Sequence, residues 1–176
     1  MSSIEAIQHV NIIRHNLPDD GTYPNNALHP LVIYKCAIRL SEKNPDREVK
    51  ALLKTNNWHN AWTNGIYEYH HYHSITHEVL AVIQGSARVQ FGGPSGVTLL
   101  VDKGDVIIIP AGVAHKAIEL FDDFKVVGAY PSGMDYDVLT EKDNREKAIE
   151  NIKSVKLPDR DPVYGEGGPL LSNWTH

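Results

Sequence analysis

Histidine, glutamate, glycine and proline residues recur at fixed spacings in the middle of the chain, and these spacings constrain the fold more than any other feature. The residues form two groups, first Gly65, His71, His73, Glu78 and Gly85, then Gly104, Pro110, Gly112 and His115. Successive side chains of a β-strand point to opposite faces, so His71 and His73 share a face and Tyr72 takes the other. A bend through residues 74–76 would return Glu78 to the same interior. The pattern predicts short strands that turn back around a shared interior.

The second group has the pattern of a strand, a tight turn and a returning strand. Residues 106–109 are apolar, Pro110 and Gly112 favour a turn, and residues 115–120 can form the strand that follows. This turn would deliver His115 to the base of the returning strand. Three imidazoles and one carboxylate that converge form a ligand set for one divalent transition metal. The ligand types do not choose among Fe, Mn, Ni, Co and Zn.

Both groups resemble the two sequence motifs of the cupin superfamily. The first matches G-x5-H-x-H-x4-E-x6-G at every fixed position, and the second matches G-x5-P-x-G-x2-H-x3-N except that Glu119 stands in place of Asn. The resemblance implies an all-β fold, a cupin-type β jelly-roll barrel with one or two short flanking helices. It also implies that one metal ion is bound by His71, His73, Glu78 and His115.

Further stretches of the chain are similar to the YjlB-like group of small single-domain bacterial cupins. They are residues 70–80, 91–94, 127–131 and 161–165. The resemblance covers most of the chain, and it implies no particular reaction. We therefore expect one cupin domain over residues 1–176, with a core barrel at about 31–130 and a helical and irregular C-terminal extension at 131–176.

Local patterns place the other elements. Residues 31–40 alternate as a strand, residues 45–54 and 141–153 suit short helices, and several short strands separated by Gly and Pro turns follow from about residue 66 to 130. Gly85 is expected to end one strand, and residues 86–91 to begin another. The tail from Pro158 is expected to be irregular. Its apolar residues favour packing on the domain over covering the barrel mouth or exchanging with a partner subunit.

Length, charge and cysteine content limit the class of protein. A chain of 176 residues with 41% hydrophobic and 22% charged residues suits one globular domain. A net charge of −5 argues against nucleic acid as a partner, and no apolar run approaches the roughly 20 residues of a membrane span. The lone Cys36 cannot form an internal disulfide, and residues 1–5 show no leader pattern. We expect a cytoplasmic protein.

Two further residues are candidates for acid–base catalysis. Glu119 lies four residues after His115 and would share its face in a regular strand, where it could act as a base; the alternative is an exposed residue at a strand end. Tyr72 could act as a base only if it faced inward. His70 and His77 are expected to point away from the metal ligands. Tyr67, Tyr69, Trp58 and Trp62 surround the first group and suit either a core or a pocket mouth.

Three functions fit these residues. The first is a metal-dependent enzyme, a dioxygenase or an isomerase, that acts on a small polar molecule at the open positions of the metal. The second is a non-catalytic cupin that binds or senses a small molecule. The third is a structural metal, and the absence of cysteine near the motifs disfavours it. The family resemblance also implies a homodimer.

Overall fold

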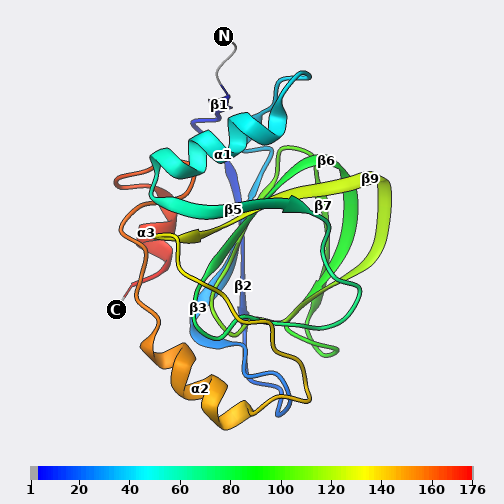
Figure 1. Ribbon diagram of the computed structural model, residues 1–176, viewed down its shortest axis with the longest axis vertical. Coiled ribbons are helices and arrows are strands. Elements are labelled where there is room, and N and C mark those ends of the chain that lie inside the picture. Colours follow the sequence, from blue (N-terminus) through cyan, green and yellow to red (C-terminus); the bar gives the residue numbers. More distant parts are fainter. Residues whose placement is uncertain (1–3, 176) are drawn as a thin grey trace.

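Antiparallel β-strands are the predominant secondary structure of the computed structural model, which describes residues 4–175 (Figure 1). The strands are β1 (Glu5–Ala6), β2 (Asn11–Leu17), β3 (Asn26–Lys35), β4 (Ile38–Arg39), β5 (Trp58–Asn64), β6 (Glu78–Phe91), β7 (Val97–Asp102), β8 (Val106–Ile109) and β9 (His115–Pro131). The helices are α1 (Pro45–Thr55), α2 (Arg145–Ser154) and α3 (Pro169–Asn173). The predicted all-β barrel with a few short helices is confirmed.

One sheet of seven strands wraps around the interior. Its order is β2-β3-β8-β6-β9-β5, with β7 paired to β6, and β1 and β4 form a separate two-stranded sheet. Both faces of the central strands are buried. Leu80 and Val82 of β6 pack in the barrel interior, whereas Val79 and Ala81 pack outward against a second cluster that includes residues of α1 and α3. Glu78 shares the phase of Leu80, so the period of two directs its side chain inward.

Strand β6 is longer than the sequence predicts, because it continues through Gly85. The φ angle of Gly85 is 67°, and a Cβ there would lie 2.3 Å from the carbonyl oxygen of Phe121. The register against β9 shifts on both sides of this position. The first part of β6 pairs with β8 and the second part pairs with β7. Gly85 therefore bends one continuous strand between two partners.

The strand predicted at residues 31–40 is divided in two. It breaks after Lys35, where Cys36 adopts a φ angle of 50°, and it resumes as β4. The sheet also begins earlier than residue 31, because β2 pairs with β3 from Asn11 to Leu17. Both predicted helices are present as α1 and α2, and α2 begins at Arg145 rather than Glu141.

The C-terminal tail packs on the outside of the barrel. Val163, Leu170 and Trp174 belong to the outer hydrophobic cluster, as the apolar content of the tail predicts. The tail is not wholly irregular, since Pro169 begins the short helix α3. Trp174 donates from its indole nitrogen to the carbonyl of Pro30 at 2.8 Å, which fixes the end of the chain against β3.

Two predictions from the sequence concern a leader at the N-terminus and a membrane-spanning segment. Residues 1–3, part of the stretch on which the lack of a leader was argued, lie outside the described residues. Within residues 4–175 no helix combines the length and the apolar character that a membrane crossing requires.

Candidate metal centre

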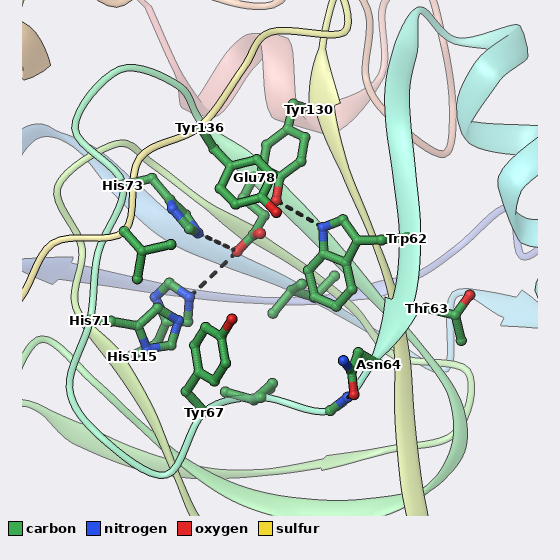
Figure 2. A pocket seen from close by; sticks show the side chains of 14 residues that line it. Trp62, Thr63, Asn64, Tyr67, His71, His73, Glu78, His115, Tyr130 and Tyr136 are labelled. Atoms are coloured by element: carbon green, nitrogen blue, oxygen red, sulfur yellow. Dashed lines mark hydrogen bonds and ion pairs between the residues drawn. The ribbon is translucent and has the colours of Figure 1, made fainter.

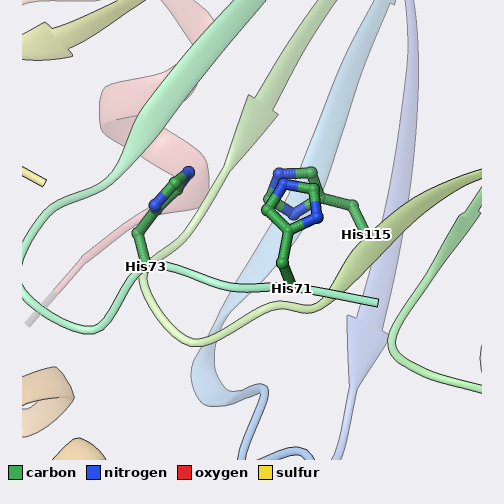
Figure 3. Close-up of side chains that lie close together, drawn as sticks. All are labelled: His71, His73 and His115. Atoms are coloured by element: carbon green, nitrogen blue, oxygen red, sulfur yellow. The ribbon is translucent and has the colours of Figure 1, made fainter. Parts of the chain in front are cut away.

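Three buried imidazoles meet at one end of the barrel interior. His71, His73 and His115 each offer a ring nitrogen, and these nitrogens lie within 4.8 Å of one another. The rings of His71 and His115 lie side by side with centroids 4.1 Å apart, and His73 faces them from 5.7 to 5.9 Å (Figure 3). The structure thus brings together three residues that are separated by up to 44 positions along the chain.

Backbone pairing between the two motifs sets this convergence. The amide of His71 donates to the carbonyl of His115 at 3.2 Å, and the amide of His115 donates to the carbonyl of His71 at 2.9 Å. The amide of Gly112 donates to the carbonyl of His73 at 2.8 Å. Gly112 has a φ angle of 94°, and a Cβ there would lie 2.3 Å from the carbonyl oxygen of Asn25. The turn that delivers His115 therefore requires glycine.

Each imidazole is oriented by a backbone carbonyl. Nδ1 of His71 contacts the carbonyl of Tyr69 at 3.0 Å, and Nδ1 of His115 contacts the carbonyl of Val113 at 3.0 Å. Nδ1 of His73 bonds to the carbonyl of Asp137. A carbonyl can only accept, so Nδ1 of each ring carries a proton, and Nε2 is the nitrogen that faces the other ligands. This is the arrangement that prepares histidines for metal binding.

Glu78 contacts two of the three imidazoles. Its Oε1 is 3.3 Å from Nε2 of His73 and 3.4 Å from Nε2 of His115 (Figure 2). Burial by itself raises the pKa of this carboxyl, but the two histidines outweigh burial and hold the pKa well below its usual range. Burial lowers the pKa of His73, and the negative charge of Glu78 outweighs it and raises that pKa overall. Glu78 is therefore an anion inside the barrel.

The electrostatic setting of His71 differs from that of His73. Burial, together with the neighbouring His115, lowers the pKa of the His71 imidazole to about 3. His71 is therefore neutral at physiological pH, with Nε2 unprotonated because Nδ1 holds the proton. Neutral imidazole is the form that binds a metal ion.

A cavity of about 280 Å³ opens above the four residues. The residues that line it are Trp62, Thr63, Asn64, Gly65, Ile66, Tyr67, His71, His73, Glu78, Leu80, His115, Tyr130, Tyr136 and Val138. In Figure 2 the imidazoles gather on one side of Glu78, and the rings of Trp62, Tyr67, Tyr130 and Tyr136 surround its other sides. The cavity thus combines a polar base with aromatic walls.

Tyr130 and Trp62 form a hydrogen-bonded pair in the wall. The indole Nε1 of Trp62 donates to the Tyr130 hydroxyl at 2.8 Å. Trp62 lies opposite Gly128 in the pairing of β5 with β9, and a Cβ on Gly128 would lie 2.3 Å from the indole. Burial and the charge of Glu78 raise the pKa of the Tyr130 hydroxyl far above its usual value. Tyr130 therefore keeps its proton.

The segment 132–144, which we call the pocket loop, closes one side of the cavity. Tyr72 and Leu139 exchange two backbone hydrogen bonds, at 3.0 and 2.9 Å. The carboxylate of Asp137 accepts from the amide of Ser74 at 2.7 Å and from its hydroxyl. Tyr136 stacks on Tyr130 with ring centroids 4.8 Å apart. The pocket loop is therefore fastened to the strand segment that carries the first two histidines.

Glu119 does not reach the cavity. The register between β6 and β9 pairs Val89 with Ala117 but Arg88 with Glu119, so β9 contains an extra residue at Ile118. This bulge removes Glu119 from the phase of His115. The Glu119 side chain is 56% exposed and lies 3.5 Å from Arg88 on the outside of the barrel. The regular strand on which its role as a base depended is absent.

Tyr72 also lies outside the cavity. It alternates with His71 and His73, and its side chain is buried in a separate cluster that includes Tyr23 and Ala148. Its ring meets that of Tyr23 edge-on at 6.3 Å. The inward position that a catalytic role for Tyr72 requires is therefore not met, and Tyr72 supports the strand segment from behind.

His70 and His77 point away from the cavity, as their phase in the sequence predicts. His77 accepts at Nδ1 from the amide of Ala111 at 2.8 Å, and its ring packs 4.6 Å from that of Trp174. Burial lowers its pKa to about 3. His70 lies 5.4 Å from the ring of Tyr23. Neither residue lines the cavity.

Several residues of the cavity wall were not predicted from the sequence. Tyr130 and Tyr136 come from the end of β9 and from the pocket loop, and neither lies within a motif. The alternation of β9 could have identified Tyr130 as buried, but no local pattern announces that residues 136–138 return to the barrel mouth. Of the aromatics around the first motif, Trp62 and Tyr67 line the cavity and Trp58 is in the outer core.

The fold and the imidazole cluster define a class of protein that the comparisons identify. Residues 56–127 match the cupin domain family. One relative is the uncharacterized protein YjlB of Bacillus subtilis (strain 168), which is 43% identical over 161 residues, or 89% of this chain and 93% of YjlB. At this identity and coverage, the chain belongs to the cupin family and to the same branch as YjlB.

Solved structures with a similar arrangement of strands are more distant. The epimerase RmlC of Legionella pneumophila has a TM-score of 0.42 and 14% identity, covering 75% of this chain and 77% of its own. Acireductone dioxygenase of Bacillus anthracis has a TM-score of 0.40 and 14% identity, covering 74% of this chain and 82% of its own. At such identities the likeness concerns the fold alone.

Proposed function

We propose that this cupin binds one divalent transition metal through His71, His73, Glu78 and His115, and that it is an enzyme acting on a small polar molecule. The observation that carries the proposal is the orientation of the imidazoles. All three have Nδ1 against a backbone carbonyl, which leaves Nε2 of each ring, together with the buried Glu78 carboxylate, as the atoms that would bind the metal. Such a donor set suits Fe, Mn, Ni, Co or Zn.

The metal would supply Lewis acidity to substrate oxygens, because four protein ligands leave open positions on a five- or six-coordinate ion. The other contributions to the reaction would come from the chain's own residues. Glu78 supplies negative charge, and the aromatic walls exclude water. Tyr130 accepts from the Trp62 indole and is hydrogen-bonded to Glu78, so its proton lies beside that carboxylate, and a Glu78 bound to the metal would leave the proton to the cavity. Tyr130 could therefore hold a proton for a substrate oxygen, as isomerisation requires.

Oxidation with O₂ and isomerisation of a carbonyl compound are both compatible with this arrangement. The second candidate function, a non-catalytic binding or sensing cupin, is favoured by one observation. Neither Glu119 nor Tyr72 lines the cavity, so no carboxylate other than the proposed ligand Glu78 is available there as a base. Turnover of any molecule that stabilises the protein against heat would count against the binding function.

Metal analysis tests the proposal. Protein purified without chelator is compared with the double variant His71→Ala/His73→Ala and with a control, His9→Ala/His15→Ala, that removes two histidines outside the cavity. We expect about one equivalent of metal in the native and control proteins and almost none in the double variant. Equal metal content in all three proteins, with folding verified by circular dichroism, would overturn the proposal.

The expected homodimer remains a prediction. Light scattering during size-exclusion chromatography measures it directly, and a monomeric mass would refute it.

A further inference from the structure

The cavity presents no positive side chain to a ligand. Among the described residues that line it, none is Lys or Arg, and the one carboxylate is Glu78. Phosphate and carboxylate groups are usually held by Arg or Lys, or by free backbone amides. One nearby amide, that of Gly65, already donates to the Asn64 side chain at 2.8 Å. A phosphorylated or multiply anionic ligand would therefore lack a positively charged partner in the cavity away from the metal.

The walls of the cavity are aromatic and held in place. Tyr67 stacks on Tyr69 with centroids 5.0 Å apart and an interplanar angle of 16°. Tyr136 stacks on Tyr130 at 4.8 Å and 18°. The two rings that line the cavity are solvent-exposed, at 53% for Tyr67 and 45% for Tyr136. Exposed rings fixed by stacking at a cavity mouth offer flat surfaces to a planar ligand.

Charge further restricts the ligand. A divalent ion, the Glu78 carboxylate and three neutral imidazoles would together carry one net positive charge. That charge is balanced by a ligand that loses a single proton on binding. Adjacent hydroxyl groups on a conjugated carbon framework have this property and can offer two oxygens to one ion. The cavity of about 280 Å³ lies at the low end of the usual range of about 300–1,000 Å³ for ligand pockets.

We propose that the ligand of this site is a small planar molecule with adjacent oxygen atoms on a conjugated framework, of the catechol or enediol type, without a phosphate or other charged tail. Tyr67 and Tyr136 line the mouth against its flat faces. This inference rests on the proposed function, because the adjacent oxygens bind through the metal.

Catechol binding tests the inference. Protein loaded with Co²⁺ is titrated with catechol, with glucose and with glucose 6-phosphate, and visible absorption and calorimetry record binding. The double variant Tyr67→Leu/Tyr136→Leu removes both mouth rings. Phe121→Leu removes an exposed ring on β9 outside the cavity and serves as the matched control. Azide, which binds metal ions without reaching the mouth, reports on the metal site itself.

We expect catechol to bind native protein at least about tenfold more tightly than either sugar, since stacking on aromatic rings adds about 1 kcal/mol or more. The double variant should weaken catechol about fivefold or more, and azide affinity and the Phe121→Leu variant should remain unchanged. Tighter binding of glucose 6-phosphate, or catechol affinity unaffected by loss of both tyrosines, would overturn the inference while the proposed function stands. Failure of Co²⁺ to bind the native protein would overturn both.

Discussion

Two buried carboxylates, Glu78 in the cavity and Asp161 in the C-terminal tail, are stabilised against the cost of burial by different kinds of partner. Asp161 is fully buried and accepts from the hydroxyl of Tyr34. It also accepts from the backbone amides of residues 163, 164 and 170, at 2.8, 2.9 and 3.0 Å. All of its partners are donors from the protein, and nothing in its surroundings is left for a ligand.

Glu78 is equally buried, but its partners are the side chains of His73 and His115, and it faces an open cavity. The histidines can exchange the carboxylate for another partner without unfolding the chain, whereas the amides around Asp161 cannot. The comparison indicates how to separate a structural carboxylate from a functional one. The former is saturated by backbone donors, and the latter is paired with groups that can themselves bind something else.

The largest predicted effect is a loss of stability on substitution of Asp161. Asp161→Ala strands the Tyr34 hydroxyl and three backbone amides without an acceptor, so we expect a loss of about 3–5 kcal/mol in the free energy of unfolding. Urea denaturation measures it, with Asp159→Ala, an exposed carboxylate two residues earlier, as control. A loss below about 1 kcal/mol would mean that the tail does not depend on this carboxylate.

Acid destabilisation of the metal-free protein is the next largest effect. Burial lowers the pKa values of His71 and His77 to about 3, so the folded state leaves them neutral while the unfolded state binds protons below about pH 6.5. For these two groups the unfolded state carries more bound protons, so their contribution to stability falls as pH falls. Between pH 6 and 5 the two groups together lose about 2 kcal/mol. His73 acts in the opposite sense, because its pKa is raised in the folded state, so the net loss is smaller.

His77→Gln should remove about half of this pH dependence, because His77 lies outside the metal centre and contributes independently of His71. Denaturation curves at pH 7, 6 and 5, recorded with chelator present, measure the slope. A free energy of unfolding that stays constant from pH 6 to 5 would show that these imidazoles are accessible to protons in the folded state.

Glu78→Gln should lower metal affinity, whereas Asp161→Ala should lower the stability of the fold. The amide keeps the shape of the side chain but removes its charge, so we expect metal affinity to fall by at least the roughly 10–100-fold known for partners of metal-binding residues. Competition with a chromophoric chelator measures the affinity. If Glu78→Gln retained native metal affinity while Asp161→Ala lost it, the functional and structural assignments would be reversed.

The smallest effect is expected at Glu119. It is exposed beside Arg88, and exposed ion pairs contribute about 0–1 kcal/mol. Glu119→Gln should therefore leave metal content and catechol affinity unchanged, and shift the melting temperature by no more than about 2 °C. A variant that lost metal or activity would indicate that the bulge at Ile118 is not kept in solution.

The period of two along the strands accounts for what the sequence could predict. It placed His71 and His73 on one side and Tyr72 behind them, whereas a bend through residues 74–76 had to be inferred to bring Glu78 to the same side. The same rule failed at Glu119, because a single extra residue at Ile118 reverses the phase and no local signal marks the bulge. The predicted strand end at Gly85 was also wrong, because glycine is equally compatible with a bend within a strand and with the end of a strand.

Contacts between distant segments could not be predicted. The pocket loop alternates apolar and acidic residues over 134–138, a pattern that does not say where the segment packs, and its position depends on Asp137 meeting Ser74 across 63 positions. The indole of Trp62 fits only because Gly128, on another strand, has no side chain. Such pairings follow from the folded geometry, and each residue alone is compatible with an exposed loop or an ordinary strand.

The bond from Nδ1 of His73 to the carbonyl of Asp137 joins metal retention to the closure of the pocket loop. Because coupling between two equilibria is reciprocal, a metal that favours the present orientation of His73 also favours the closed loop, and opening the loop weakens one ligand. The amides of Tyr72 and Leu139, which bond across the same junction, would exchange with deuterium more slowly in the loaded protein.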